Sequence, residues 1–122
     1  MIQECRRGDF NISTDPARLD LNLIHQFLAA SYWAAGVPRD VVKRSIEHSL
    51  CFGVYHRDHQ VGFARIITDY ATFAYLADVF ILETYRGQGL AGWLVEFIVA
   101  HPQLQGLRRW MLATSPLSSP RS

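Results

Sequence analysis

The chain has 122 residues and a mass of 13.9 kDa, which is the size of one ordinary domain. Apolar residues make up 49% and charged residues 19%, a composition typical of a globular domain that excludes a disordered chain. Twelve basic residues against eleven acidic ones leave a formal net charge of +1, too small to recruit nucleic acid or an anionic membrane.

The cysteines and histidines do not form the patterns of a secreted scaffold or a metal site. Cys5 and Cys51 have no paired spacing, which is typical of reduced thiols. His56 and His59 flank a turn without carboxylates at metal-ligand spacing. The first residues lack the apolar stretch of a signal peptide, and no apolar run approaches the ~20 residues that span a bilayer. We therefore expect a cytoplasmic protein with no membrane segment and no metal.

The first half of the chain predicts one short strand followed by two helices. Residues 10–14 have the composition of a strand, and the Asp-Pro pair that follows ends it. Asp20 is a plausible N-cap for a helix with apolar residues at helical spacing, which we expect to end near Trp33. Pro38 begins a second helix that reaches residue 49.

Three strands joined by short turns follow, and they predict an antiparallel meander. The strands are expected at residues 51–56, 61–68 and 73–82. In the last of them, strict alternation puts Asp78 and Phe80 on the same face as Leu76. Both faces of this strand are mostly apolar, so we expect it to lie centrally with cover on each side.

A strong helix pattern then spans residues 90–101, and residues 107–114 have the pattern of one more strand. A strand, helix, strand crossover makes this strand parallel to the strand at 73–82. Together these elements predict an α/β fold of the α+β type, with a mixed, mostly antiparallel sheet flanked by helices. We expect a single domain over residues 1–114 and an unstructured Ser/Pro-rich tail over 115–122.

The segment between the long strand and the long helix has the pattern of an anion-binding loop. Gly87 and Gly89 permit a positive φ and let main-chain N–H groups approach a ligand closely. The helix that begins next has unpaired N–H donors and about half a positive charge at its N-terminus, which suits a pyrophosphate. Arg86 could add charge or hold the loop. The alternative is a glycine turn that only lets the helix pack closely on the sheet.

Two well-known phosphate motifs do not fit this loop. The P-loop needs a Lys after its last glycine, and the chain has only Lys43. Gly87, Gly89 and Gly92 match the spacing of a dinucleotide fingerprint, but three antiparallel strands precede them and no acidic residue follows at the end of the next strand.

Instead, the segment resembles the acyl-CoA binding motif of the GNAT superfamily of N-acyltransferases. That motif is Arg/Gln-x-x-Gly-x-Gly/Ala, and Arg86, Gly89 and Ala91 stand at its defining positions. The order of elements over residues 10–114 is also that of the family. The resemblance implies that acetyl-CoA is the co-substrate and that the loop amides bind its pyrophosphate, while the preceding strand pairs with the pantetheine arm. The implied cofactor-binding residues are Phe80, Ile81, Arg86, Gly87, Gln88, Gly89, Leu90 and Ala91.

Acylation of an amine needs a group that removes a proton from the amine. Asp78 is a candidate base, because a carboxylate among apolar neighbours on a central strand can have a raised pKa. Its structural alternative is an ion pair with Arg65 on the adjacent strand. Glu83 is a second candidate at the strand end, where a solvated acid is the alternative. Neither cysteine lies near the loop, which favours direct transfer.

The acceptor would be a primary amine of a small molecule or a peptide. Tyr32 and Trp33 are candidates for the acceptor pocket, because that region has this role in the family, although aromatic residues at a helix end can also belong to the core. The sequence thus predicts an N-acetyltransferase.

The resemblance stops near Thr114, where family members continue with a helix and two more strands. We therefore expect a shortened member, whose last strand has an exposed, rather apolar edge that a second copy could cover to form a homodimer. The alternative function is a CoA-binding but catalytically impaired domain that acts by ligand binding or dimerisation.

Overall fold

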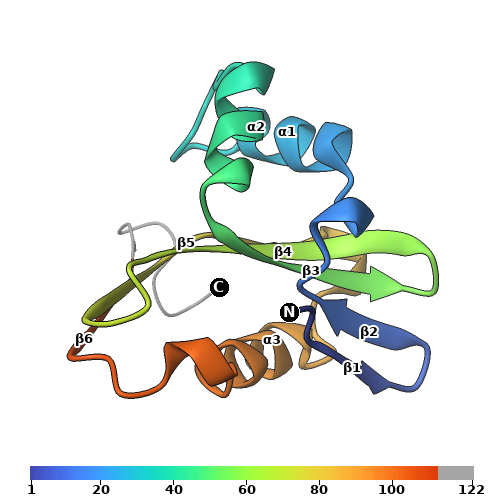
Figure 1. The fold of residues 1–122 in the computed structure, drawn as a ribbon. Coiled ribbons are helices and arrows are strands. Elements are labelled where there is room, and N and C mark those ends of the chain that lie inside the picture. The colour runs from blue at the N-terminus through green and yellow to red at the C-terminus, as the bar shows by residue number, and fades with distance from the viewer. Residues whose placement is uncertain (113–122) are drawn as a thin grey trace.

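In the part of the chain that the structure describes, the protein is a six-stranded sheet with helices on both faces (Figure 1). The computed structural model describes residues 1–112, so residues 113 and 114 of the last predicted strand and the predicted tail lie outside the described residues. The strands follow one another across the sheet in chain order: β1 (Glu4–Arg7), β2 (Phe10–Ser13), β3 (Leu50–His56), β4 (His59–Thr68), β5 (Phe73–Ile81) and β6 (Arg109–Leu112). The first five strands are antiparallel and β6 is parallel to β5, as the crossover predicts.

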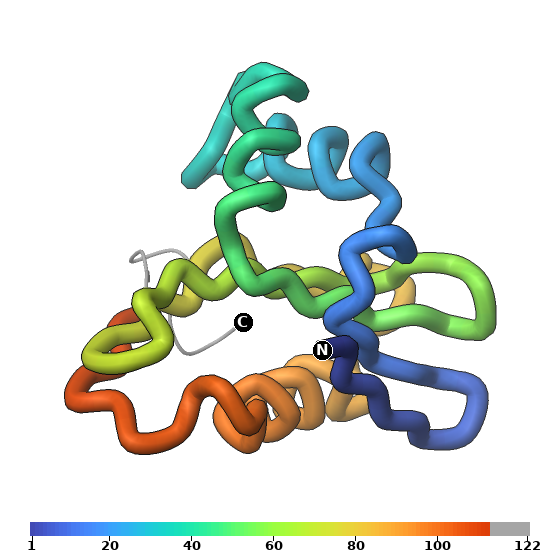
Figure 2. Tube along the Cα trace, in the orientation of Figure 1, coloured from blue at the N-terminus to red at the C-terminus, as the bar shows by residue number. Residues whose placement is uncertain are grey.

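The helices form one layer on each face of the sheet. Helices α1 (Leu21–Ala30) and α2 (Arg39–Glu47) lie over one face, and α3 (Leu90–Val99) lies over the other (Figure 1). The tube in Figure 2 shows the α1–α2 pair, in blue to green, as a separate layer above the sheet. Asp20 caps α1 as predicted, because its Oδ1 accepts a hydrogen bond from Leu23 N at 3.1 Å. Within residues 1–112, three single-turn helices connect the elements: η1 (Pro16–Arg18), η2 (Glu83–Tyr85) and η3 (Pro102–Leu104).

Two apolar clusters hold the layers together. The larger cluster packs α3 against the sheet, and Phe52, Leu94 and Ile98 are fully buried in it. The smaller one packs α1 and α2 against the opposite face around Ile24 and Phe63, which are also fully buried. Burial of side chains this large stabilises each layer by roughly 1.5–3 kcal/mol per residue before the entropic cost of ordering is counted.

The strand β1 was missed by the sequence reading. Its residues Glu4 to Arg7 are charged apart from Cys5, so they give no alternating apolar signal. The feature of the sequence that could have revealed β1 is the turn after it. Gly8, with a φ of +62°, and Asp9 form the two-residue turn of a hairpin that joins β1 to β2. A charged strand of this kind protects the edge of the sheet.

The strict alternation predicted for the strand at 73–82 is wrong. Leu76 packs in the α3 cluster and Phe80 packs in the α1–α2 cluster, although both positions are even. The cause is a β-bulge: Phe63 pairs with Phe80, but Arg65 pairs with Ala77, so β5 contains one extra residue. That residue is Asp78, whose φ of +52° is in the left-handed region. Because of the bulge, the β5 residues that follow Asp78 point to the opposite faces from those that strict alternation predicts.

One further expectation needs correction. Helix α1 ends at Ala30, not near Trp33, because Ser31 adopts an extended backbone and its hydroxyl donates to Leu28 O at 2.6 Å. Tyr32 and Trp33 therefore lie in the loop between α1 and α2. Trp110 is 36% exposed on β6, whereas Trp93 of α3 is buried.

Candidate functional site

A groove of about 580 Å³ runs between the loop after α1 and the beginning of α3. It brings together most of the residues predicted for the site from three separate parts of the chain. The predicted residues that line it are Tyr32, Trp33, Phe80, Ile81, Arg86, Gly87, Gly89, Leu90 and Ala91. Val79, in the strand that the resemblance pairs with the pantetheine arm, lines the groove too, and the lining residues that sequence reasoning did not assign to the site are Phe27, Tyr85 and Gly92.

The glycine loop has the conformation that its sequence predicts. Gly87 and Gly89 have φ values of +81° and +79°, a region that residues with a side chain adopt only at a cost. A Cβ placed on Gly87, Gly89 or Gly92 would have no other heavy atom within 4 Å. The glycines are therefore not required for close helix packing, the alternative raised above. They leave open space over the main chain of the loop.

The N-terminus of α3 faces this open space. Gly89 is the N-cap residue of α3, and no side chain caps the helix. The first intrahelical bond runs from Trp93 N to Gly89 O at 3.1 Å, so the N–H groups of Leu90 and Ala91 lie before the first bonded turn. These uncapped donors, together with the helix dipole, create a favourable place for an anionic group.

Arg86 holds the loop against the end of β5. Its Nε donates to the carbonyl oxygen of Ile81 at 2.9 Å, while the residue as a whole stays exposed. This bond uses one of the five N–H donors of the guanidinium. Arg86 therefore holds the loop, and it also lines the groove.

The end of β5 offers main-chain groups along the groove. Leu82 N, just after β5, donates to Val61 O at 2.8 Å, and Phe80 pairs with Phe63, so Phe80 and Leu82 direct their main chain toward β4. By the alternation of an antiparallel ladder, Val79 and Ile81 direct theirs to the opposite edge. Pairing with β6 covers only Phe73 to Leu76 of this edge among the described residues.

Tyr85 connects the loop to the far end of β3. Its hydroxyl lies 3.4 Å from Nδ1 of His56, and its ring meets Phe10 edge to face with centroids 6.1 Å apart. Since Tyr85 immediately precedes Arg86, this aromatic cluster fixes the start of the glycine loop. Sequence reasoning missed Tyr85 because nothing in its neighbours predicts a partner so far along the chain.

Asp78 makes the ion pair that was its structural alternative. Its Oδ2 accepts from Nε of Arg65 at 2.7 Å, and its Oδ1 accepts from Nε1 of Trp33 at 3.1 Å. Arg65 also donates to the hydroxyl of Ser49 at 3.2 Å. The carboxylate is therefore a connection between β4, the bulge of β5 and the loop after α1.

Besides Asp78, two predicted site residues do not line the groove, Glu83 and Gln88. Glu83 begins η2 and is exposed, and its carbonyl oxygen accepts from Arg86 N at 3.2 Å. Gln88 is exposed as well, and its amide reaches back to Tyr85 O at 3.5 Å. Both residues shape the loop through these contacts.

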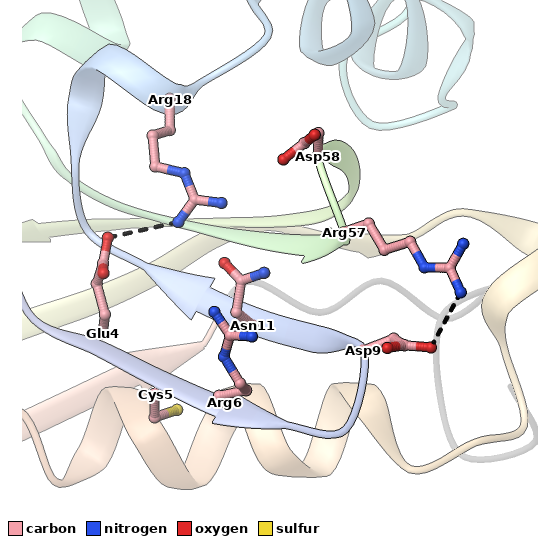
Figure 3. Close-up of a pocket in the computed structure, with 8 residues that line it drawn as sticks. All are labelled: Glu4, Cys5, Arg6, Asp9, Asn11, Arg18, Arg57 and Asp58. Atoms are coloured by element: carbon pink, nitrogen blue, oxygen red, sulfur yellow. Dashed lines mark hydrogen bonds and ion pairs between the residues drawn. The ribbon is translucent and has the colours of Figure 1, made fainter.

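A second, larger hollow of about 800 Å³ lies over β1, β2 and the β3–β4 turn (Figure 3). Its three arginines are balanced by three carboxylates, and two of these form ion pairs at 3.4 Å, Arg18 with Glu4 and Arg57 with Asp9. It has neither a helix N-terminus nor a glycine loop among its lining residues. The larger volume therefore does not make it the better candidate for the chemistry.

Residues 1–112 contain no group of three or more His, Cys, Asp or Glu residues that could hold a metal ion. Within the same residues, no helix has the length and apolar character to cross a bilayer.

Comparison with known proteins gives a consistent result. The model of the acetyltransferase (GNAT) family matches residues 19–120. The chain is 35% identical to a proposed acetyltransferase of Gibberella zeae, over 93% of this chain and 76% of that protein. The crystal structure of a proposed GNAT acetyltransferase from Xanthomonas campestris pv. campestris has a TM-score of 0.86 and 52% identity, and the match covers 88% of this chain and 76% of that one. A proposed acetyltransferase from Clostridium acetobutylicum, crystallised with acetyl-CoA, shares the fold with a TM-score of 0.62 and 14% identity, over 97% of this chain and 84% of that one.

Proposed function

The chain belongs to the GNAT family of acetyltransferases, and from this premise we propose that it transfers an acetyl group from acetyl-CoA to a primary amine of a small molecule or a peptide. The observation that carries this proposal is the loop from Arg86 to Ala91, where two left-handed glycines, an uncapped helix N-terminus and an arginine meet at one groove. The Clostridium acetobutylicum relative, which was crystallised with acetyl-CoA, supports the choice of donor.

The pyrophosphate of acetyl-CoA would bind at the loop. The main-chain N–H groups from Gly87 to Ala91 would donate to the phosphate oxygens, and the free donors of Arg86 would add a positive charge. The open Cβ positions of Gly87 and Gly89 provide the room that a phosphate group needs.

The rest of the donor would follow the end of β5. The N–H groups of Val79 and Ile81, which point to the edge away from β4, can pair with the amides of the pantetheine arm. Phe80 and Ile81 would then border the reacting carbonyl. When bound, acetyl-CoA supplies a thioester, which is the activated acyl group that the amine attacks.

Asp78 and Glu83 stay our candidates for accepting the proton of the amine. Asp78 is better placed, because it contacts the groove residue Trp33, whereas Glu83 lies outside the groove. However, both oxygens of Asp78 already accept hydrogen bonds. To take a proton, Asp78 must break its hydrogen bond with Trp33 or Arg65, or must use a lone pair that a water molecule can reach. We therefore expect its main role to be the positioning of Trp33.

The positions of the two cysteines and the pKa of Cys51 agree with direct attack by the amine. Neither cysteine lines the groove. Cys51 is 7% exposed, and its burial raises the pKa of the thiol to about 12, so it stays protonated and unreactive near neutral pH. These observations support a transfer without an acyl-enzyme intermediate.

Calorimetric titration followed by an activity assay tests the proposal. We expect acetyl-CoA to bind with micromolar affinity, and a panel of primary amines to release free thiol from it. Binding without thiol release would favour the alternative, a CoA-binding domain that is catalytically impaired. No binding at all would overturn both.

A homodimer through β6 stays part of the proposal. The strand is at the edge of the described sheet, and Met111 and Leu112 are 46% and 61% exposed. Sedimentation at micromolar concentration should give twice the mass of 13.9 kDa. Met111→Lys should restore the monomer, and a monomeric unmodified chain would refute this arrangement.

A further inference from the structure

Four aromatic rings that line the groove form a continuous wall. Phe27 and Phe80 are stacked, with centroids 3.9 Å apart and planes at 9°. Trp33 lies 6.3 Å from Phe27, and Tyr32 meets Trp33 edge to face at 5.4 Å. We call these four residues the aromatic wall.

The outer part of this wall is not explained by core packing. Phe80 is 4% exposed and belongs to the α1–α2 cluster, but Tyr32 and Trp33 are 49% and 45% exposed. All four side chains line the groove. Large exposed aromatic residues that gather at a groove indicate a binding surface more often than a structural one.

Trp33 is also held in a fixed orientation. Its indole N–H donates to Oδ1 of Asp78 at 3.1 Å, and Arg65 fixes the other oxygen of Asp78 at 2.7 Å. The polar end of the indole is therefore satisfied by the protein, and its apolar face stays open at the groove. A ligand that stacks on this face would not have to order the side chain first.

The charges around the groove restrict what it can hold. Arg86 is the one Arg, Lys, Asp or Glu residue among its described lining residues, and it lies in the glycine loop. No carboxylate of the described residues lines the groove, and Asp78, which contacts the groove residue Trp33, is paired with Arg65. A polycationic acceptor would therefore find no counter-charge here.

From these observations we propose that the acceptor is an amine with a flat aromatic substituent, which stacks on the aromatic wall while its amino group points along the groove toward Phe80 and Ile81. This inference rests on the proposed function. In the transfer, a C–N bond forms and the C–S bond of the thioester breaks, while the amine loses one proton and the leaving thiolate gains one.

The wall should hold the substituent and not the reacting nitrogen. An aromatic cage around an amino group stabilises the protonated, cationic form. The attack requires the neutral amine, so such a cage would oppose the reaction. Stacking of the substituent avoids this conflict and still uses the open face of Trp33.

Three amines test the proposal with the full chain and acetyl-CoA. They are 2-phenylethylamine, its saturated counterpart 2-cyclohexylethylamine, and spermidine. An aromatic ring that stacks on the wall gains energy in addition to that of burying its surface. We therefore expect kcat/KM for the phenyl compound to be about three- to tenfold above that of the cyclohexyl compound. The preference over spermidine should be larger still, on the order of a hundredfold, because both stacking and burial are lost.

Variants connect this preference to the wall. Trp33→Ala should bring the two ring amines to within about twofold of each other, while Trp33→Phe should keep part of the difference. Neither variant should change the dissociation constant of acetyl-CoA measured by calorimetry. Tyr70→Asn is the matched control, because Tyr70 is 46% exposed, does not line the groove and has a φ of +61° that asparagine tolerates.

The outcomes separate the inference from the function on which it rests. If acetyl-CoA does not bind, the proposed function fails and this inference fails with it. If acetyl-CoA binds but 2-phenylethylamine is not acetylated, or if spermidine or the cyclohexyl compound is the better substrate, only the aromatic acceptor is overturned. An unchanged preference in Trp33→Ala would also overturn it.

Discussion

The indole Nε1 of Trp33 donates a hydrogen bond to Oδ1 of Asp78 at 3.1 Å, and this contact ties the loop after α1 to the bulge in β5. The bulge has two effects here. It places Asp78 where it can contact both Trp33 and Arg65, and it turns Phe80 from the face that alternation predicts toward the α1–α2 layer. The one extra residue in β5 thus sets both the position of Phe80 in the aromatic wall and the position of Asp78, which holds Trp33.

The variant Asp78→Asn tests whether Asp78 is a positioning residue or the base. Asparagine tolerates the left-handed backbone and can still accept from Trp33, but it leaves the charge of Arg65 unpaired. We expect the free energy of unfolding to fall by about 1–3 kcal/mol and kcat by less than about tenfold. Urea unfolding and a pH–rate profile measure both quantities.

A different result would assign the base. Loss of a well-placed general base costs roughly 10²–10⁴ in rate and removes the acidic limb of the pH–rate profile. If Asp78→Asn shows both effects while it stays folded, Asp78 is the proton acceptor and our positioning role is wrong.

The glycine loop can be tested by Gly89→Val. A valine at a φ of +79° is strained, and its side chain would occupy the open space over the loop. We expect acetyl-CoA binding to be lost in calorimetry, with the free energy of unfolding lowered by about 1–2 kcal/mol. The matched control is Gly106→Val, because Gly106 has a φ of +73° and open surroundings but does not line the groove. Equal loss of binding in both variants would refute the assignment of the loop.

Arg86 should contribute through both its charge and its bond to Ile81. Arg86→Gln removes both, so we expect the dissociation constant of acetyl-CoA to rise by about tenfold or more. Arg86→Lys keeps the charge without the fork of donors, and its affinity should lie in between. Arg44→Gln, at an exposed position of α2, should bind as the unmodified chain does. Identical affinities for the lysine and glutamine variants would mean that the charge has no role.

We expect the folded protein to lose stability on acidification because of His101. The residue is 3% exposed and packs edge to face on Phe52, and burial, assisted by the positive chain terminus, lowers the pKa of its imidazole. The unfolded chain therefore binds a proton more readily, and stability falls as the pH drops below the ordinary histidine value of about 6.5. Urea midpoints should be lower at about pH 5 than at about pH 7.

The variant His101→Asn checks the origin of this pH dependence. Nδ1 of His101 accepts from Gln103 N at 3.1 Å, and the asparagine oxygen can take over this role at the start of η3. Its urea midpoint should change less between the two pH values than that of the unmodified chain. An equal change in both proteins would assign the acid sensitivity to other groups.

Much of the fold could be predicted from periodicity, and the failures have identifiable causes. Helix α3 and the loop before it follow directly from an apolar stripe and from glycines at the turn. The bulge at Asp78 could not be predicted, because an extra residue in a strand leaves no mark in a single sequence except a local break of alternation, and β5 is apolar on both faces. Hence the side on which Phe80 lies was also beyond prediction.

The candidate site was predicted in part for a similar reason. The loop residues are contiguous, so a short motif identifies them together. Phe27 was missed because its helical spacing in α1 is that of a core residue, and its stack on Phe80 joins positions far apart in the chain. Such a contact is created by tertiary packing and is not encoded in any local pattern.

The most direct test of the account is a crystal structure of the chain with acetyl-CoA. We predict that its pyrophosphate lies on the main-chain N–H groups between Gly87 and Ala91, with the pantetheine arm along Val79 and Ile81 and the acetyl group beside Phe80. Electron density for the ligand in the hollow over β1 and β2, or at any place other than this groove, would contradict it.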